Sequence, residues 1–150
     1  MSEMKFLFFG PPRIERAGEV FEIGLNKGKA LLAYLLVSDQ PHGRDALAAM
    51  FWPEHGGGRG RANLRRTLYR LTQQLGDGIL VATGDAIGPN PDASLSIDVL
   101  TFRRLASQAT MLADAANIYQ GDFLAGFSLP DCPAFDEWQF FESESLRQLL

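Results

Sequence analysis

The chain has 150 residues, of which 46% are hydrophobic and 21% are charged, which is typical of a soluble globular protein. No apolar run approaches the roughly 18 residues that a membrane-spanning helix needs, and the first residues lack the basic region and cleavage site of a signal peptide. The single cysteine, Cys132, excludes an internal disulfide, so we expect a cytoplasmic protein that does not bind membranes.

The net charge of −4 is unevenly distributed along the chain. Residues 1–90 contain 11 basic and 9 acidic side chains, whereas residues 91–150 contain 3 basic and 9 acidic ones. Such asymmetry is a better indication of a nucleic-acid partner than the total charge is. We therefore expect any DNA contact in the first part and none in the acidic second part.

Short apolar runs separated by turn residues open the chain. Residues 5–9 end at a Gly-Pro-Pro break, and the runs 13–16 and 20–23 flank Ala17 and Gly18. Apolar runs that alternate with turn residues in this way predict a small N-terminal antiparallel sheet.

Helical patterns follow this sheet. Asn26 is expected to cap a first helix that ends near residue 39, and residues 44–52 predict a second helix that Pro53 ends. Residues 54–60 contain four glycines and predict a loop. A third helix is expected at about 61–75.

The third helix is rich in arginine. The stretch Arg59–Arg70 contains five arginines in twelve positions and no acid. Four leucines recur at helical spacing and predict one buried face, with Asn63, Arg66 and Arg70 on the opposite side; they are Leu64, Leu68, Leu71 and Leu75.

The remainder of the chain predicts a hairpin and further helices. Apolar runs on either side of Thr83-Gly84-Asp85 indicate a tight hairpin at about 79–88. Residues 95–97 form a candidate short strand, and Asp98 is a candidate cap for the next helix. Further helices are expected at about 111–120 and from Ala134 to the end.

A sheet, three helices and a hairpin, in this order, are typical of a winged helix-turn-helix. We therefore predict an α+β fold in which a winged helix-turn-helix with an N-terminal antiparallel sheet precedes an all-α, tetratricopeptide-like segment. In a helix-turn-helix, the second helix of the pair enters the major groove of double-stranded DNA. Here that helix is the arginine-rich one.

The candidate DNA contacts follow from this placement. Arg66 and Arg70 are expected to contact bases, with Asn63 and Thr67 beside them, because Arg and Asn side chains can read base edges. Phosphate contacts are expected from Arg59, Arg61 and Arg65. Thr83, at the tip of the predicted hairpin, is a further candidate DNA contact.

Several segments, taken in order, resemble the SARP/AfsR-type transcriptional regulators. These proteins carry an OmpR/PhoB-type winged helix followed by a bacterial transcriptional activator domain. The matching segments of the first half are 31–35, 44–47, 51–53 and 61–71, and those of the second half are 97–99, 102–105, 119–124 and 135–138. The resemblance covers nearly the whole chain.

The resemblance implies a sequence-specific DNA-binding transcription regulator. Residues 1–94 would be the winged helix-turn-helix domain, and 95–150 the start of an activator domain that continues further. The family's recognition helix corresponds to 61–75 and its wing to about 79–88. The resemblance also suggests that the loop 54–60 contacts RNA polymerase, and that two copies pair on direct repeats in DNA.

An alternative is a protein-interaction module, in which the acidic, aromatic-rich segment 98–150 docks a partner and the winged helix is only structural. An enzyme is not expected. Residues 24–30 match a phosphate-binding P-loop poorly, because the spacing is one residue short and no Ser or Thr ends it. His42 and His55 have no Cys or acid cluster at ligand spacing, so neither a metal nor a cofactor is expected.

Overall fold

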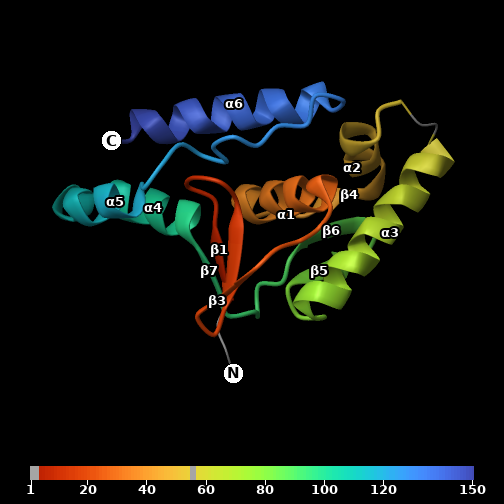
Figure 1. The fold of residues 1–150 in the computed structure, drawn as a ribbon, viewed down its shortest axis with the longest axis horizontal. Helices are drawn as coiled ribbons and strands as arrows, with labels where there is room; N and C mark the ends of the chain where they lie inside the picture. The colour runs from red at the N-terminus through yellow and green to blue at the C-terminus, as the bar shows by residue number, and fades with distance from the viewer. Residues whose placement is uncertain (1–3, 55–56) are drawn as a thin grey trace. The chain divides into compact units, whose positions relative to one another are not determined.

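The structure is a computed structural model that describes residues 4–54 and 57–150 (Figure 1). The chain forms two compact units, and each is discontinuous in sequence. The sheet unit contains the described residues through Glu22 together with Ser94–Ser128 and Asp136–Leu150, and the helix–hairpin unit contains Ile23–Ala93 and Leu129–Phe135. These units differ from the contiguous division at residue 94 expected above, because the N-terminal strands share a unit with the C-terminal segment.

A four-stranded sheet forms the centre of the sheet unit. Its strands are β1 (Met4–Leu7), β2 (Arg13–Arg16), β3 (Glu19–Phe21) and β7 (Leu95–Ile97), in the order β3-β2-β1-β7. The first three strands pair antiparallel, as expected for the N-terminal sheet. The strand β7 adds a parallel pairing with β1 that the sequence pattern did not indicate.

Helices and a hydrogen-bonded loop complete the sheet unit. Aromatic side chains fill its core: Phe9 packs edge-on against Phe102, with ring centroids 5.3 Å apart, and Phe123 packs against Trp138 at 5.6 Å. The amide of Leu124 donates to the carbonyl of Phe8 at 2.7 Å. The elements are α4 (Asp98–Ala106), a 3-10 turn η1 (Ala109–Met111), α5 (Leu112–Ile118) and α6 (Pro133–Gln148). The first residues of α6, through Phe135, belong to the helix–hairpin unit.

Asp98 does not act as the expected helix cap. Its carboxylate accepts hydrogen bonds from the amides of Phe8 and Phe9, just beyond β1, at 2.9–3.0 Å, and from the adjacent amide of Val99 at 2.8 Å. Helix α4 has no side-chain cap. The carboxylate therefore ties the end of β1 to the start of α4, and its partial burial raises its pKa above the ordinary value.

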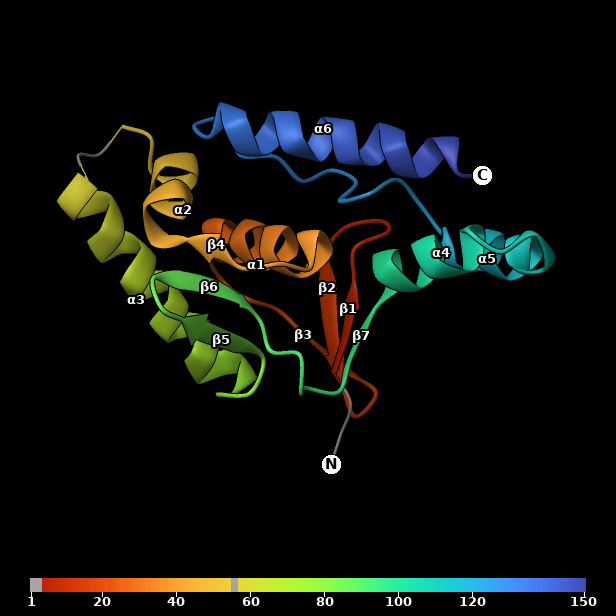
Figure 2. The same ribbon diagram turned by 180° about the vertical axis from the view of Figure 1, so that it is seen from behind.

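The helix–hairpin unit contains the expected order of three helices and a hairpin (Figure 2). Helix α1 is its buried centre, because Leu31, Leu35 and Leu36 are fully inaccessible. Asn26 is already inside α1, and the preceding residue, Leu25, makes no side-chain cap, so the expected Asn26 cap is wrong. The elements are α1 (Asn26–Ser38), β4 (His42–Gly43), α2 (Arg44–Phe51), α3 (Gly57–Leu75), β5 (Leu80–Thr83) and β6 (Ala86–Pro89).

The hairpin forms a three-stranded sheet in the order β4-β6-β5. Gly88 of β6 lies directly against Pro41, since a Cβ at this position would come within 2.8 Å of the proline Cα. The amide of Arg44 donates to the carbonyl of Asp85 at 3.0 Å, which joins the start of α2 to the hairpin turn. The hairpin is therefore fixed against the helices and does not project alone.

Candidate nucleic-acid interface

Helix α3 begins earlier than the sequence suggested. It covers Gly57–Leu75, so Arg59 and Gly60 are helical and the expected loop 54–60 is shorter than predicted. Residues 55 and 56 of that loop lie outside the described residues. Gly60 allows the close approach of α2 and α3, because a Cβ there would be 3.3 Å from the Cβ of Ala48. The glycine-rich start is therefore part of the packed helix.

The buried face of α3 differs slightly from the leucine stripe. Leu64, Leu71 and Leu75 are buried as expected, but Leu68 is only half-buried. The fourth buried position is Thr67, which is 6% exposed. Thr67 therefore packs closely, although it lines a hollow together with Asn63, Arg66 and Arg70, beside which the sequence analysis placed it.

The exposed side of α3 carries a row of polar side chains. Arg59, Asn63, Arg66 and Arg70 follow one another at intervals of four, three and four residues, which places them on one helix face. The three arginines are exposed and Asn63 is half-buried. Arg65 is also exposed but lies on the flank. We call Arg59, Asn63, Arg66 and Arg70 the arginine row.

Two members of the arginine row are hydrogen-bonded to each other. The guanidinium of Arg66 donates from Nη2 to Oδ1 of Asn63, one turn earlier. This contact holds the arginine head group against the helix and leaves its other N–H groups for a partner. Within the described residues, Arg70 and Arg65 form no ion pair.

Arg61 has a different environment from the arginine row. Its Nε donates to Oδ1 of Asp45 on α2, and the two side chains form an ion pair on the surface. This contact lowers the pKa of Asp45 and raises that of Arg61. An anion that binds Arg61 must therefore compete with a carboxylate that is already in place.

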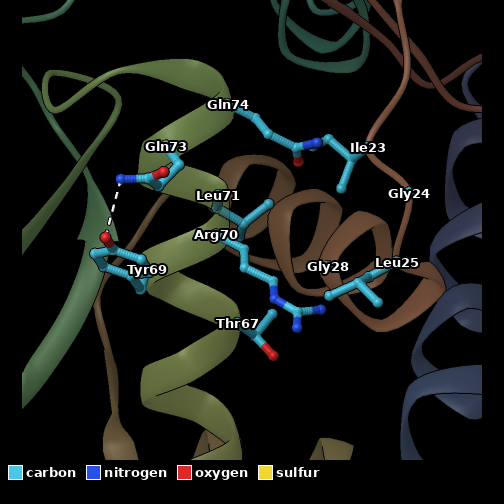
Figure 3. A pocket seen from close by; sticks show the side chains of 10 residues that line it. All are labelled: Ile23, Gly24, Leu25, Gly28, Thr67, Tyr69, Arg70, Leu71, Gln73 and Gln74. Atoms are coloured by element: carbon cyan, nitrogen blue, oxygen red, sulfur yellow. Dashed lines mark hydrogen bonds between the residues drawn. The ribbon is translucent and has the colours of Figure 1, made fainter.

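A groove of about 410 Å³ runs beside α3, along the start of α1. Figure 3 shows the side chains of Arg70 and Thr67 extending from α3 toward Leu25 and Gly28. A smaller hollow continues from it past Asn63 and Arg66 to Trp52. Most of the arginine row thus borders a surface depression.

Lys27, at the start of α1, makes two side-chain contacts. Its ammonium lies 3.1 Å from the carboxylate of Asp131 and 5.4 Å from the centre of the Trp52 ring. Nearby, the thiol of Cys132 donates to the carbonyl of Phe51 at 3.2 Å. Segment 129–135 therefore packs against the helices as part of this unit, through contacts with residues about 80 to 100 positions earlier in the chain, which a local sequence pattern does not reveal.

The tip of the hairpin is accessible. Thr83 is exposed and pairs with Ala86 across the β5–β6 turn. Asp85, also exposed, adds a negative charge next to it. Thr83 can therefore reach a partner, but the tip is not basic.

Among residues 4–54 and 57–150, no group of three or more His, Cys, Asp or Glu side chains could hold a metal ion. None of the helices in these ranges combines the length and the apolar character that a membrane crossing requires.

Comparisons with known proteins give a likeness in structure. No family model matches the chain, and neither does any curated protein. Its structure is similar to that of Mycobacterium tuberculosis EmbR, solved in complex with a low-affinity phosphopeptide, with a TM-score of 0.73 and 20% sequence identity. The match covers 99% of this chain and 44% of the EmbR chain.

At this level of identity the likeness shows the fold. The mixed arrangement of an N-terminal sheet and helices is that of the matching part of EmbR, which agrees with the α+β class expected from the sequence. The match spans less than half of EmbR, so the activity and partners of the whole of that protein do not transfer from it.

Proposed function

We propose that this chain binds double-stranded DNA through α3 and acts as a transcription regulator. The arginine row carries this proposal, because it places three exposed arginines and an amide on one face of a helix that contains no acid. A helix of this width fits the major groove, where Arg and Asn can read base edges. The helices and hairpin around α3 have the order of a winged helix-turn-helix.

The members of the site have different roles in this proposal. Arg66 and Arg70 contact bases, and Asn63 acts with Arg66 through their hydrogen bond. Arg59 and Arg65 contact phosphates, which fixes the position of the helix on DNA. Arg61 reaches a phosphate only after it leaves Asp45. Thr67 is only 6% exposed and lines the hollow beside Arg66 and Arg70, so in this proposal it supports these two arginines.

Two observations support the assignment to a regulator. The sequence resembles the SARP/AfsR-type regulators over nearly its whole length, and its fold is similar to that of EmbR, a SARP-family regulator. In this scheme, the hairpin β5–β6 is the wing, and Thr83 contacts the DNA backbone. We propose no catalytic role and no cofactor.

Two further partners follow from the resemblance. The segment 54–60 would contact RNA polymerase, although residues 57–60 now belong to α3 and Gly60 is buried against α2. Pairing of two copies on direct repeats of DNA would increase the effective affinity of each copy.

Selection from a pool of random DNA duplexes tests the proposal. The protein should enrich a defined sequence, and titration of that duplex should show tighter binding than titration of a shuffled one. Specific sites are typically bound about 10³-fold or more tightly than non-specific DNA. Enrichment of no sequence, together with no binding at low salt, would reject DNA recognition by this chain.

A further inference from the structure

Two phenylalanines are exposed on α6. Phe140 is 59% exposed and Phe141 is 61% exposed, and their rings contact each other edge-on with centroids 5.5 Å apart. Single exposed apolar residues are common, but two adjacent aromatic rings on a helix surface are typical of an interaction site. This pair plays no part in the proposed DNA contact.

A hollow of about 240 Å³ lies beside Phe140. Asp136, Phe140 and Ser143 line it from α6, at the helical spacing that places them on one side. Phe127 and Ser128 line it from the preceding loop. The hollow therefore combines aromatic walls with a carboxylate and two hydroxyl groups.

Gln139, which also lines the hollow, has an unused acceptor. Its Nε2 donates to the carbonyls of Phe127 at 2.9 Å and Leu124 at 3.3 Å, which fixes the orientation of the amide. Its Oε1 is buried and accepts no hydrogen bond from any described residue.

The charge around this surface is negative. Asp136 lines the hollow, and Glu137 is exposed one turn before Phe141. The nearest basic side chain on α6, Arg147, is held by Glu144 at 2.9 Å and Asp122 at 3.2 Å. A basic partner is therefore favoured over an acidic one.

We propose that this surface docks an amphipathic helix from a partner protein that carries Lys or Arg beside apolar side chains. A basic side chain enters the hollow, where its stem packs on Phe127 and Phe140 and its N–H groups reach the carboxylate of Asp136. Apolar side chains of the partner cover Phe140 and Phe141. We call Phe127, Asp136, Gln139, Phe140 and Phe141 the docking surface.

A labelled amphipathic helical peptide of Leu and Lys serves as the probe. Fluorescence anisotropy with the 150-residue chain should show saturable binding, whereas the same peptide with Glu in place of Lys should bind at least about tenfold more weakly. Chemical-shift changes in NMR spectra of the protein should be concentrated at the docking surface.

Substitutions locate the binding. The double variant Phe140→Ser, Phe141→Ser and the single variant Asp136→Asn should each lower affinity for the Lys peptide by about tenfold. Leu112→Ser and Asp114→Asn on α5 remove an exposed apolar side chain and an exposed acid elsewhere in the same unit, so they are matched controls. Both should bind the peptide like the parent protein, and circular dichroism should confirm that all variants fold.

Three results would overturn the proposal. The first is an equal loss of peptide affinity in the control variants and the docking-surface variants. The second is a set of peptide-induced chemical-shift changes that spreads over all acidic surfaces. The third is concentration-dependent self-association of the protein that Phe140→Ser abolishes. The last would mean that a second copy covers this face. DNA affinity should be unchanged in every docking-surface variant, so failure here is distinguishable from failure of the proposed DNA binding.

Discussion

Arg61, in the first turns of α3, donates a hydrogen bond to Asp45 of α2, sixteen residues earlier in the chain. The pair is on the surface, with the arginine side chain 49% exposed and the aspartate 73% exposed. Among the described residues, Arg61 is thus a candidate phosphate contact that already pairs with a competing carboxylate. The five arginines of the stretch 59–70 therefore differ in how readily they can bind a phosphate.

Loss of the competing carboxylate should strengthen non-specific DNA binding. In Asp45→Asn, Arg61 is released and a negative charge near the interface is lost, so binding to a shuffled duplex should tighten at low salt. The slope of log K against log salt should steepen by about 0.9, the value for one added phosphate contact. Asp77→Asn, an exposed acid in the same unit, is the control and should change the slope less. An unchanged slope in Asp45→Asn would mean that Arg61 does not meet a phosphate.

Loss of Arg61 itself should act in the opposite direction. Arg61→Ala should weaken binding to selected and shuffled duplexes alike and reduce the salt slope, because a phosphate contact carries no sequence information. In the Asp45→Asn background, the same substitution should have a larger effect. NMR titration of Asp45 gives a second readout, since its pKa should be below 3.8 in the parent protein and closer to 3.8 in Arg61→Ala.

The position of the hairpin should depend on Gly88. A methyl group there would lie 2.8 Å from the Cα of Pro41, so the backbone of β6 or of the residues just before β4 must move. Gly88→Ala should lower the free energy of unfolding by about 1–3 kcal/mol, the usual cost of overpacking. At Gly78 a Cβ would meet nothing within 4 Å, so Gly78→Ala is the matched control for urea denaturation. Equal stability of the two variants would contradict the close packing of the hairpin.

The pH dependence of stability should reveal the buried environment of Asp98. Burial raises its pKa above the ordinary value of 3.8 although three amides donate to it. Because the pKa of Asp98 is raised in the folded state, protonation of its carboxyl group stabilises the folded protein. This contribution to stability is fully present below about pH 3.8 and is lost as the pH rises through the folded-state pKa. The penalty of Asp98→Asn, measured by urea denaturation, should therefore be larger at acidic than at neutral pH. A penalty that grows with pH would contradict this, and Asp114→Asn controls for the loss of an exposed charge.

The sequence predicted which helices and strands form better than it predicted where each of them begins and ends. Regular leucine spacing located α3, but the glycines at 57, 58 and 60 indicated a loop where the helix has already begun. Thr67 replaced Leu68 on the buried face because the packing direction of α3 is set by α1 and α2, which a single helix pattern does not contain. Two-residue strands such as β4 are too short to have a pattern.

Contacts between distant residues were beyond prediction. The carboxylate of Asp98 was expected to serve its own helix, but the amides that it binds are about ninety residues away at the end of β1. The pairing of Arg61 with Asp45 was not predicted either, because it depends on how α2 packs against α3 and not on the pattern of either helix. By contrast, the exposed positions of Arg66 and Arg70 follow from helical periodicity alone and agree with the structure.

The specificity ratio of the arginine-row variants tests the central claim most directly. Affinity for the selected and shuffled duplexes should be measured at one salt concentration for the parent protein, Arg66→Ala, Arg70→Ala and the control Arg104→Ala, which removes an exposed arginine from α4 in the other unit. Each arginine-row variant should lose about 1–3 kcal/mol of discrimination between the two duplexes, whereas Arg104→Ala should retain it. Equal discrimination in all four proteins would contradict base recognition by α3.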